Sequence, residues 1–137
     1  MRAALAAAIV AAALLAGCGG DVGELITIST HGGAGDNHRF VVTGDGRGSC
    51  DGGEQRTLPS QHVLDAREVE RKLKKEAKAR ATFRDGPAGA RRYVAFTNDG
   101  VVTWVEGARG APPEVAQAIL LVQNLKRDLC GGGASGP

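Results

Sequence analysis

The Asp99-Gly100 pair is the feature that most constrains the fold, because it separates two β-rich runs, residues 92–97 and 101–106. An Asp-Gly pair readily adopts the backbone conformations that a tight hairpin turn requires. The two runs are therefore predicted to pair as an antiparallel hairpin. The aromatic residues of these runs are expected to pack within the sheet and not to stack on a ligand; they are Tyr93, Phe96 and Trp104.

A second hairpin is predicted near the start of the chain. Residues 24–30 and 39–43 carry β-branched side chains in rough alternation, and a Gly-rich segment, residues 31–37, joins them. Residues 44–59 are again rich in glycine and show no periodicity. We therefore expect a loop there, held in place by Cys50.

A first helix is predicted from a capping signal. Asp65 would be the N-cap, Glu68 its capping partner, and Leu64 would pack on Val69. The predicted buried stripe comprises Ala66, Val69, Leu73 and Ala77. Residues 71–75 look basic, but acidic and basic side chains four residues apart indicate a solvated helix face. These pairs are Glu68 with Lys72, Glu70 with Lys74, and Glu76 with Arg80.

A second helix is predicted after Pro112-Pro113, because proline suits the first turn of a helix. Cys130 would lie just past its end. Its predicted buried stripe comprises Val115, Ile119, Val122, Leu125 and Leu129. The resulting order, ββαββα, predicts an α+β fold in which a four-stranded antiparallel sheet carries two helices packed on one face.

The N-terminus is typical of an export signal, because Arg2 precedes an apolar run from Ala3 to Leu15. This run is shorter than the roughly 20 apolar residues that a membrane span requires, so we expect a cleaved leader. Leu15-Ala16-Gly17-Cys18 resembles the lipobox of bacterial lipoproteins. The resemblance implies cleavage before Cys18 and two or three acyl chains, palmitate among them, on that cysteine. The alternative is an ordinary secreted protein.

Lipid on Cys18 would hold the chain on the extracytoplasmic face of the cell membrane, since two acyl chains suffice for stable anchoring. The predicted organisation is a signal peptide over residues 1–17, a tether over 18–23, a single α+β domain over 24–130 and a flexible tail over 131–137. Without Arg2, the 17 basic residues become 16, against 15 acidic ones. This balance argues against nucleic acid as a partner, and we expect a monomer.

Two cysteines remain once Cys18 is assigned to lipid. Cys50 and Cys130 would then pair as a disulfide, which persists outside the cytoplasm. On the chain-entropy model such a bond stabilises the fold by about 4 to 5 kcal/mol. The alternatives are two free thiols or a metal pair, but neither cysteine has a recognisable second ligand nearby in the sequence.

The sequence contains no motif for a catalytic nucleophile, a zinc protease, a phosphate loop or a redox Cys-x-x-Cys pair, so we expect no enzyme and no catalytic residue. Its three histidines are His31, His38 and His62. His31, Asp36 and His38 could bind a transition metal across the first hairpin loop. Their spacing matches no recognised motif, however, so a polar loop is favoured and no metal or cofactor is expected.

Several features of residues 24–129 together resemble the emfourin family of protein inhibitors of thermolysin-like metallopeptidases. They are a strand that runs into Gly32-Gly33, a helix opened by Leu64 and Glu68, a hairpin led by Tyr93, and a closing helix introduced by Ala111-Pro112-Pro113. The resemblance implies steric inhibition, in which a loop or sheet edge enters the protease cleft.

The partner-binding loop that we predict comprises His31, Gly32, Gly33, Asp36 and His38. The leading hypothesis is a membrane-anchored, non-enzymatic binding module, with inhibition of an extracellular thermolysin-like metallopeptidase as its specific form. The alternative is a structural or assembly lipoprotein that binds another envelope protein.

Overall fold

A computed structural model describes residues 23–33 and 37–131. The leader, Cys18, Asp36 and residues 132–137 lie outside the described residues. Strands β1 to β7 comprise Glu24–His31, His38–Thr43, Arg47–Cys50, Arg56–Thr57, Thr82–Phe83, Arg92–Thr97 and Gly100–Val105. Helices α1, α2 and α3 comprise Ser60–Lys72, Lys74–Lys78 and Glu114–Leu125, and a π-helical turn, η1, follows over Lys126–Cys130.

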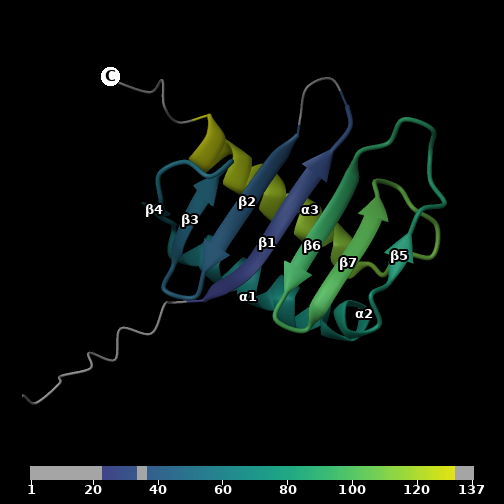
Figure 1. The fold of residues 1–137 in the computed structure, drawn as a ribbon, viewed down its shortest axis with the longest axis horizontal. Coiled ribbons are helices and arrows are strands. Elements are labelled where there is room, and N and C mark those ends of the chain that lie inside the picture. The colour runs from purple at the N-terminus through teal and green to yellow at the C-terminus, as the bar shows by residue number, and fades with distance from the viewer. Residues whose placement is uncertain (1–22, 34–36, 132–137) are drawn as a thin grey trace, which may run out of the picture.

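The strands form one sheet in the order β4-β3-β2-β1-β6-β7-β5 (Figure 1). Both predicted hairpins are confirmed: β1 pairs antiparallel with β2, and β6 with β7, where Thr97 lies opposite Gly100. The α+β class is correct. The four-stranded antiparallel sheet and the ββαββα order are wrong, because β3, β4 and β5 extend the sheet and β5 runs parallel to β7.

Strand β3 arises in the segment that was predicted to be a loop. It pairs with β2, where Phe40 lies opposite Cys50. Gly48 brings the strand close to its neighbours, since a β-carbon there would lie 2.9 Å from Leu58 Cδ1 and 3.1 Å from Leu129 Cδ1. Glycine has no side chain, so it allows this close packing but contributes nothing to an alternation of apolar and polar residues. The strand therefore cannot be recognised from the sequence.

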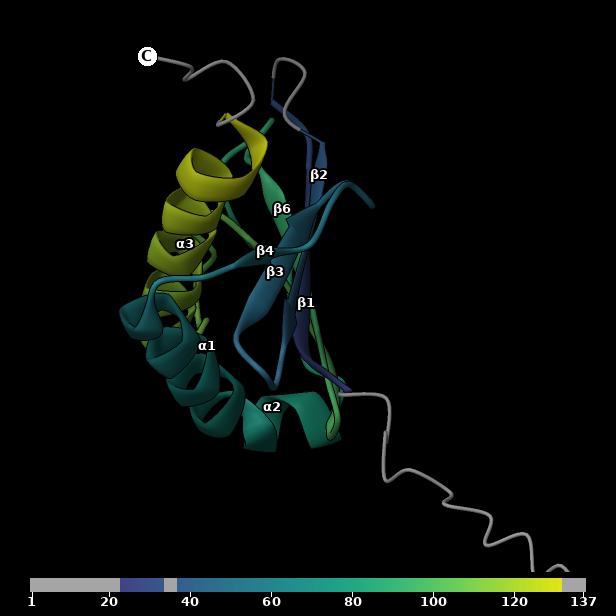
Figure 2. The same cartoon turned by 90° about the vertical axis from the view of Figure 1, so that its left-hand side faces the viewer.

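The helices cover one face of the sheet and leave the other face open (Figure 2). Tyr93 and Trp104 are buried on the covered face and stack with ring centroids 5.3 Å apart. Phe96, by contrast, belongs to the open face and is 49% exposed, so it does not pack as Tyr93 and Trp104 do. The sheet's share of the core comprises Ile26, Ile28, Phe40, Val42, Tyr93, Ala95, Val102 and Trp104.

The first helix begins earlier than predicted. Pro59 has an extended backbone and precedes Ser60, so Asp65 lies inside α1 and accepts a hydrogen bond from Gln61 Nε2 at 2.8 Å. The predicted capping box is therefore wrong, as is the staple, because Leu64 is exposed. The buried stripe is confirmed at Ala66, Val69, Leu73 and Ala77, although a break at Leu73 separates α1 from α2. The predicted ion pair between Glu68 and Lys72 is present at 2.9 Å.

Helix α3 begins directly after Pro113, as predicted. Its buried face is rotated from the predicted stripe and includes Ala118 and Leu121 with Val122 and Leu125. The other predicted residues, Val115, Ile119 and Leu129, are partly buried against the core. The helix runs on into η1, so Cys130 ends that turn and does not follow the helix in a loop.

Candidate functional site

Elements distant in the sequence meet at one end of the sheet. The end of β1, the start of β2 and the end of η1 lie there, while the start of β1 lies at the opposite end (Figures 1 and 2). We call the first end, which carries His31, His38 and Cys130, the loop end. The end at Gly23 is the tether end.

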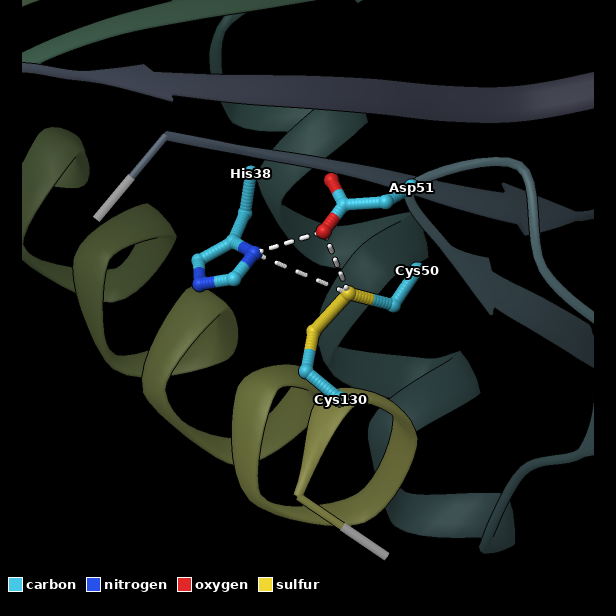
Figure 3. A group of neighbouring side chains, drawn as sticks. All are labelled: His38, Cys50, Asp51 and Cys130. Atoms are coloured by element: carbon cyan, nitrogen blue, oxygen red, sulfur yellow. Dashed lines mark hydrogen bonds and ion pairs between the residues drawn. A yellow bond between two sulfur atoms is a disulfide. The ribbon is translucent and has the colours of Figure 1, made fainter. Parts of the chain in front are cut away.

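A disulfide joins Cys50 of β3 to Cys130 of η1, as predicted from the cysteine count (Figure 3). The two Cα atoms are 5.5 Å apart, and 80 residues separate the cysteines in the sequence. The bond therefore fastens the last helical segment to the sheet. His62 of α1 supports the same turn, since its Nδ1 atom lies 3.0 Å from Asp128 Oδ2.

His38 and Asp51 form a polar pair beside the disulfide. His38 Nδ1 lies 2.8 Å from Asp51 Oδ2, and the backbone N–H of Arg39 donates to Asp51 Oδ1 at 2.8 Å. Burial alone would raise the pKa of Asp51, but the hydrogen bonds from His38 and Arg39 and the charge of His38 lower it overall. Asp51 has a left-handed backbone, φ 54°, which aspartate tolerates better than most residues do.

The Cys50 sulfur completes a compact group with this pair. It lies 3.4 Å from Asp51 Oδ2 and 3.9 Å from His38 Nδ1. Figure 3 shows the same nitrogen of His38 facing both neighbours. A histidine that passes a proton between a nucleophile and a carboxylate uses its two nitrogens separately. The group is therefore not arranged as a catalytic triad. Instead, His38 Nδ1, Asp51 Oδ2 and Cys50 Sγ all lie close to one another.

A shallow cavity of about 460 Å³, wide open to solvent, adjoins the disulfide. Its lining includes three cationic side chains and no carboxylate; the lining residues are His38, Arg91, Gln123, Lys126, Arg127, Cys130 and Gly131. Arg91 also reaches the loop, because a β-carbon on Gly33 would lie 3.6 Å from Arg91 Nη2. This arrangement suits an anionic group, and a carboxylate in particular.

The predicted partner-binding loop divides between the two faces of the sheet. His38 pairs with Thr30 across the hairpin and faces the helices, whereas the next residue of β1, His31, faces the open side. Gly32 and Gly33 have φ values of 89° and 77°, and Gly32 N–H donates to Asn37 Oδ1 at 3.0 Å. The structure thus keeps His31 and His38 apart and places His38 beside Asp51.

Sequence reasoning missed Asp51 and the cations of the cavity. Asp51 directly follows Cys50 and precedes two glycines, and this Asp-Gly-Gly sequence indicates a turn beside the disulfide. The contact with His38 depends on the register of β2 and β3, which that signal does not supply. Arg91, Lys126 and Arg127 meet only through the packing of η1 against the sheet.

Comparisons of the chain with protein-family models, curated proteins and solved structures find no match. Among residues 23–33 and 37–131, no helix has the length and apolar character to cross a bilayer.

Proposed function

We propose that this chain is a non-enzymatic binding module of the bacterial envelope, anchored by lipid on Cys18, whose loop end engages a protein partner. The observation that carries this proposal is that β1 begins at Glu24, directly after the predicted tether, and ends at His31, at the loop end (Figure 1). An eight-residue strand spans about 26 Å. An anchor attached through Gly23 would therefore direct the loop end away from the membrane.

The loop end also has chemistry suited to recognition. Arg91, Lys126 and Arg127 line the cavity beside the disulfide, so a partner segment that carries a carboxylate complements it. The Cys50–Cys130 bond restrains one wall of the cavity, and a hydrogen bond joins the described residues Gly32 and Asn37. A site restrained in this way loses less conformational entropy when it binds.

The specific form of the proposal is inhibition of an extracellular thermolysin-like metallopeptidase. The resemblance to emfourin supports it, as does a hairpin loop at the free end of the sheet. In this mechanism the loop enters the protease cleft and its backbone occupies substrate positions. An acidic segment near the cleft would meet the cationic cavity.

A second candidate is a structural or assembly lipoprotein that binds another envelope protein through the open sheet face. The exposure of Phe96 on that face favours it. A hollow there is lined by His31, Arg39 and Phe96, with Glu24, Thr27, Ser29 and Val94. The two candidates therefore use different surfaces.

Titration of the full chain, carrying Cys18→Ser and kept in mild detergent, into a thermolysin-like protease tests the specific form. We expect micromolar chain to slow peptide hydrolysis. Arg127→Glu should raise the inhibition constant at least about tenfold, because the reversed charge repels an acidic segment. Arg127 is 68% exposed, so this change spares the core, and it also removes the 3.3 Å ion pair between Arg127 and Asp128.

Phe96→Ala is the matched control on the open face and should leave inhibition unchanged. Hydrolysis that continues at its full rate would overturn the protease proposal. In that case, crosslinking in intact envelopes distinguishes the surfaces: loss of the crosslinked product with Arg127→Glu supports a loop-end partner, and loss with Phe96→Ala supports the assembly candidate.

A further inference from the structure

The group beside the disulfide has the donor atoms of a metal site. One ligand atom from each of His38, Cys50, Asp51 and Cys130 lies within 4.8 Å of the others. Three of the separations are 2.8, 3.4 and 3.9 Å. In a tetrahedral zinc site, bonds of about 2.0 to 2.3 Å place neighbouring ligand atoms roughly 3.3 to 3.8 Å apart. Of the three observed separations, 3.4 Å lies within that range, 3.9 Å lies just above it and 2.8 Å lies below it.

We infer that reduction of the Cys50–Cys130 disulfide converts this group into a site for a divalent transition metal, with His38 and Asp51 as the other ligands. Two thiolates, an imidazole and a carboxylate suit Zn²⁺ or Co²⁺, whereas Mg²⁺ and Ca²⁺ prefer oxygen ligands alone. The bonded sulfurs of the disulfide cannot act as two thiolates. The redox state of the pair therefore controls metal binding.

The chemical step requires a dithiol reductant. The dithiol transfers two electrons and two protons to the disulfide, so that the Cys50–Cys130 bond breaks, two thiols form and the reductant closes to its own disulfide. The metal then displaces both thiol protons into solvent. Rotation about the Cα–Cβ bonds separates the sulfurs, and the Cα separation of 5.5 Å allows this without a large backbone shift.

The two other ligands are held in place independently of the disulfide. The backbone N–H of His38 donates to Thr30 Oγ1 at 3.1 Å, which fixes the strand at this position. Asp51 keeps one oxygen on the Arg39 N–H at 2.8 Å and turns the other toward His38 and Cys50 (Figure 3). Outer hydrogen bonds of this kind orient metal ligands.

Co²⁺ is the probe for the test, because a tetrahedral cobalt–thiolate site absorbs visibly. The sample is the full chain with Cys18→Ser, in detergent and without oxygen, before and after reduction by a phosphine. We expect the reduced chain to bind Co²⁺ in a one-to-one complex with a thiolate-to-metal charge-transfer band. The oxidised chain should give no such band.

His38→Ala and Asp51→Ala should each weaken Co²⁺ binding to the reduced chain at least about tenfold. His31→Ala, on the opposite face of the same hairpin, is the matched control and should leave it unchanged. Absence of the band in the reduced chain overturns the inference, as does equal binding by the His38 and Asp51 variants. Circular dichroism supplies a further criterion: a reduced chain that unfolds and does not refold with Co²⁺ also overturns it.

Discussion

Gly100 of β7 lies directly against the carbonyl oxygen of Ala77, so that a β-carbon on Gly100 would overlap the end of α2. Its φ of 148° is also one that residues with a side chain rarely adopt. Close contact and backbone conformation therefore both require glycine in the turn that joins β6 to β7.

Gly100→Ala should lower the free energy of unfolding by about 2 kcal/mol or more, through backbone strain and displacement of α2. Gly89→Ala is the matched control, since Gly89 has a φ of 73° but no atom lies within 4 Å of the place where its β-carbon would be. Backbone strain alone should then cost about 1 kcal/mol. Urea denaturation measures both values, and equal losses in the two variants would contradict the contact with Ala77.

The disulfide should contribute much of the stability of the domain. Replacing both Cys50 and Cys130 with alanine should lower the free energy of unfolding by about 4 to 5 kcal/mol on the chain-entropy model, given their separation of 80 residues. Urea denaturation of the oxidised chain and of the variant supplies the measurement. An unchanged midpoint, or recovery of free Cys50 and Cys130 thiols from the exported protein, would refute the bond.

Asp51 should make the stability of the disulfide-bonded chain depend on pH. Its folded pKa lies below the ordinary value of 3.8, so its ionised form stabilises the fold above that pH. The contribution is lost as the pH falls through the folded pKa. Asp51→Asn should therefore destabilise the chain more at about pH 6 than at about pH 2.

The difference at about pH 6 should not exceed about 1 kcal/mol, because the Asp51 side chain is 49% exposed and solvent screens its interactions. Asparagine tolerates the left-handed backbone, so the substitution removes the charge and one acceptor oxygen without adding backbone strain. Thermal unfolding of the wild-type chain and of Asp51→Asn at the two pH values measures this difference in stability. If Asp51→Asn lost the same amount of stability at both pH values, Asp51 would act through something other than its ionisation.

The features of the fold that could be predicted are those with a local signal. Alternating β-branched residues and the Asp99-Gly100 pair located four strands, and apolar spacing located the buried residues of α1 and α2. Strand β3 was missed because Gly48 contributes contact without alternation. The start of α1 was misplaced because the extended Pro59 begins the helix ahead of the capping signal at Asp65.

The candidate site was predictable only in part. The count of cysteines was enough to predict the disulfide between Cys50 and Cys130, because only these two remain once Cys18 is assigned to lipid. The contact between His38 and Asp51 depends on the register of two strands, and one of these, β3, has no local signal. The alternation of side chains along β1 separates His31 from His38, although the two lie close together in the sequence.

The proposed anchor is tested most directly by mass spectrometry of the N-terminal peptide from the membrane fraction of a bacterial host. We expect a peptide that begins at Cys18 and carries diacylglycerol, and we expect Cys18→Ala to abolish both the cleavage and the lipid. A mature chain that begins elsewhere, or an unmodified Cys18 at its N-terminus, would contradict the proposal.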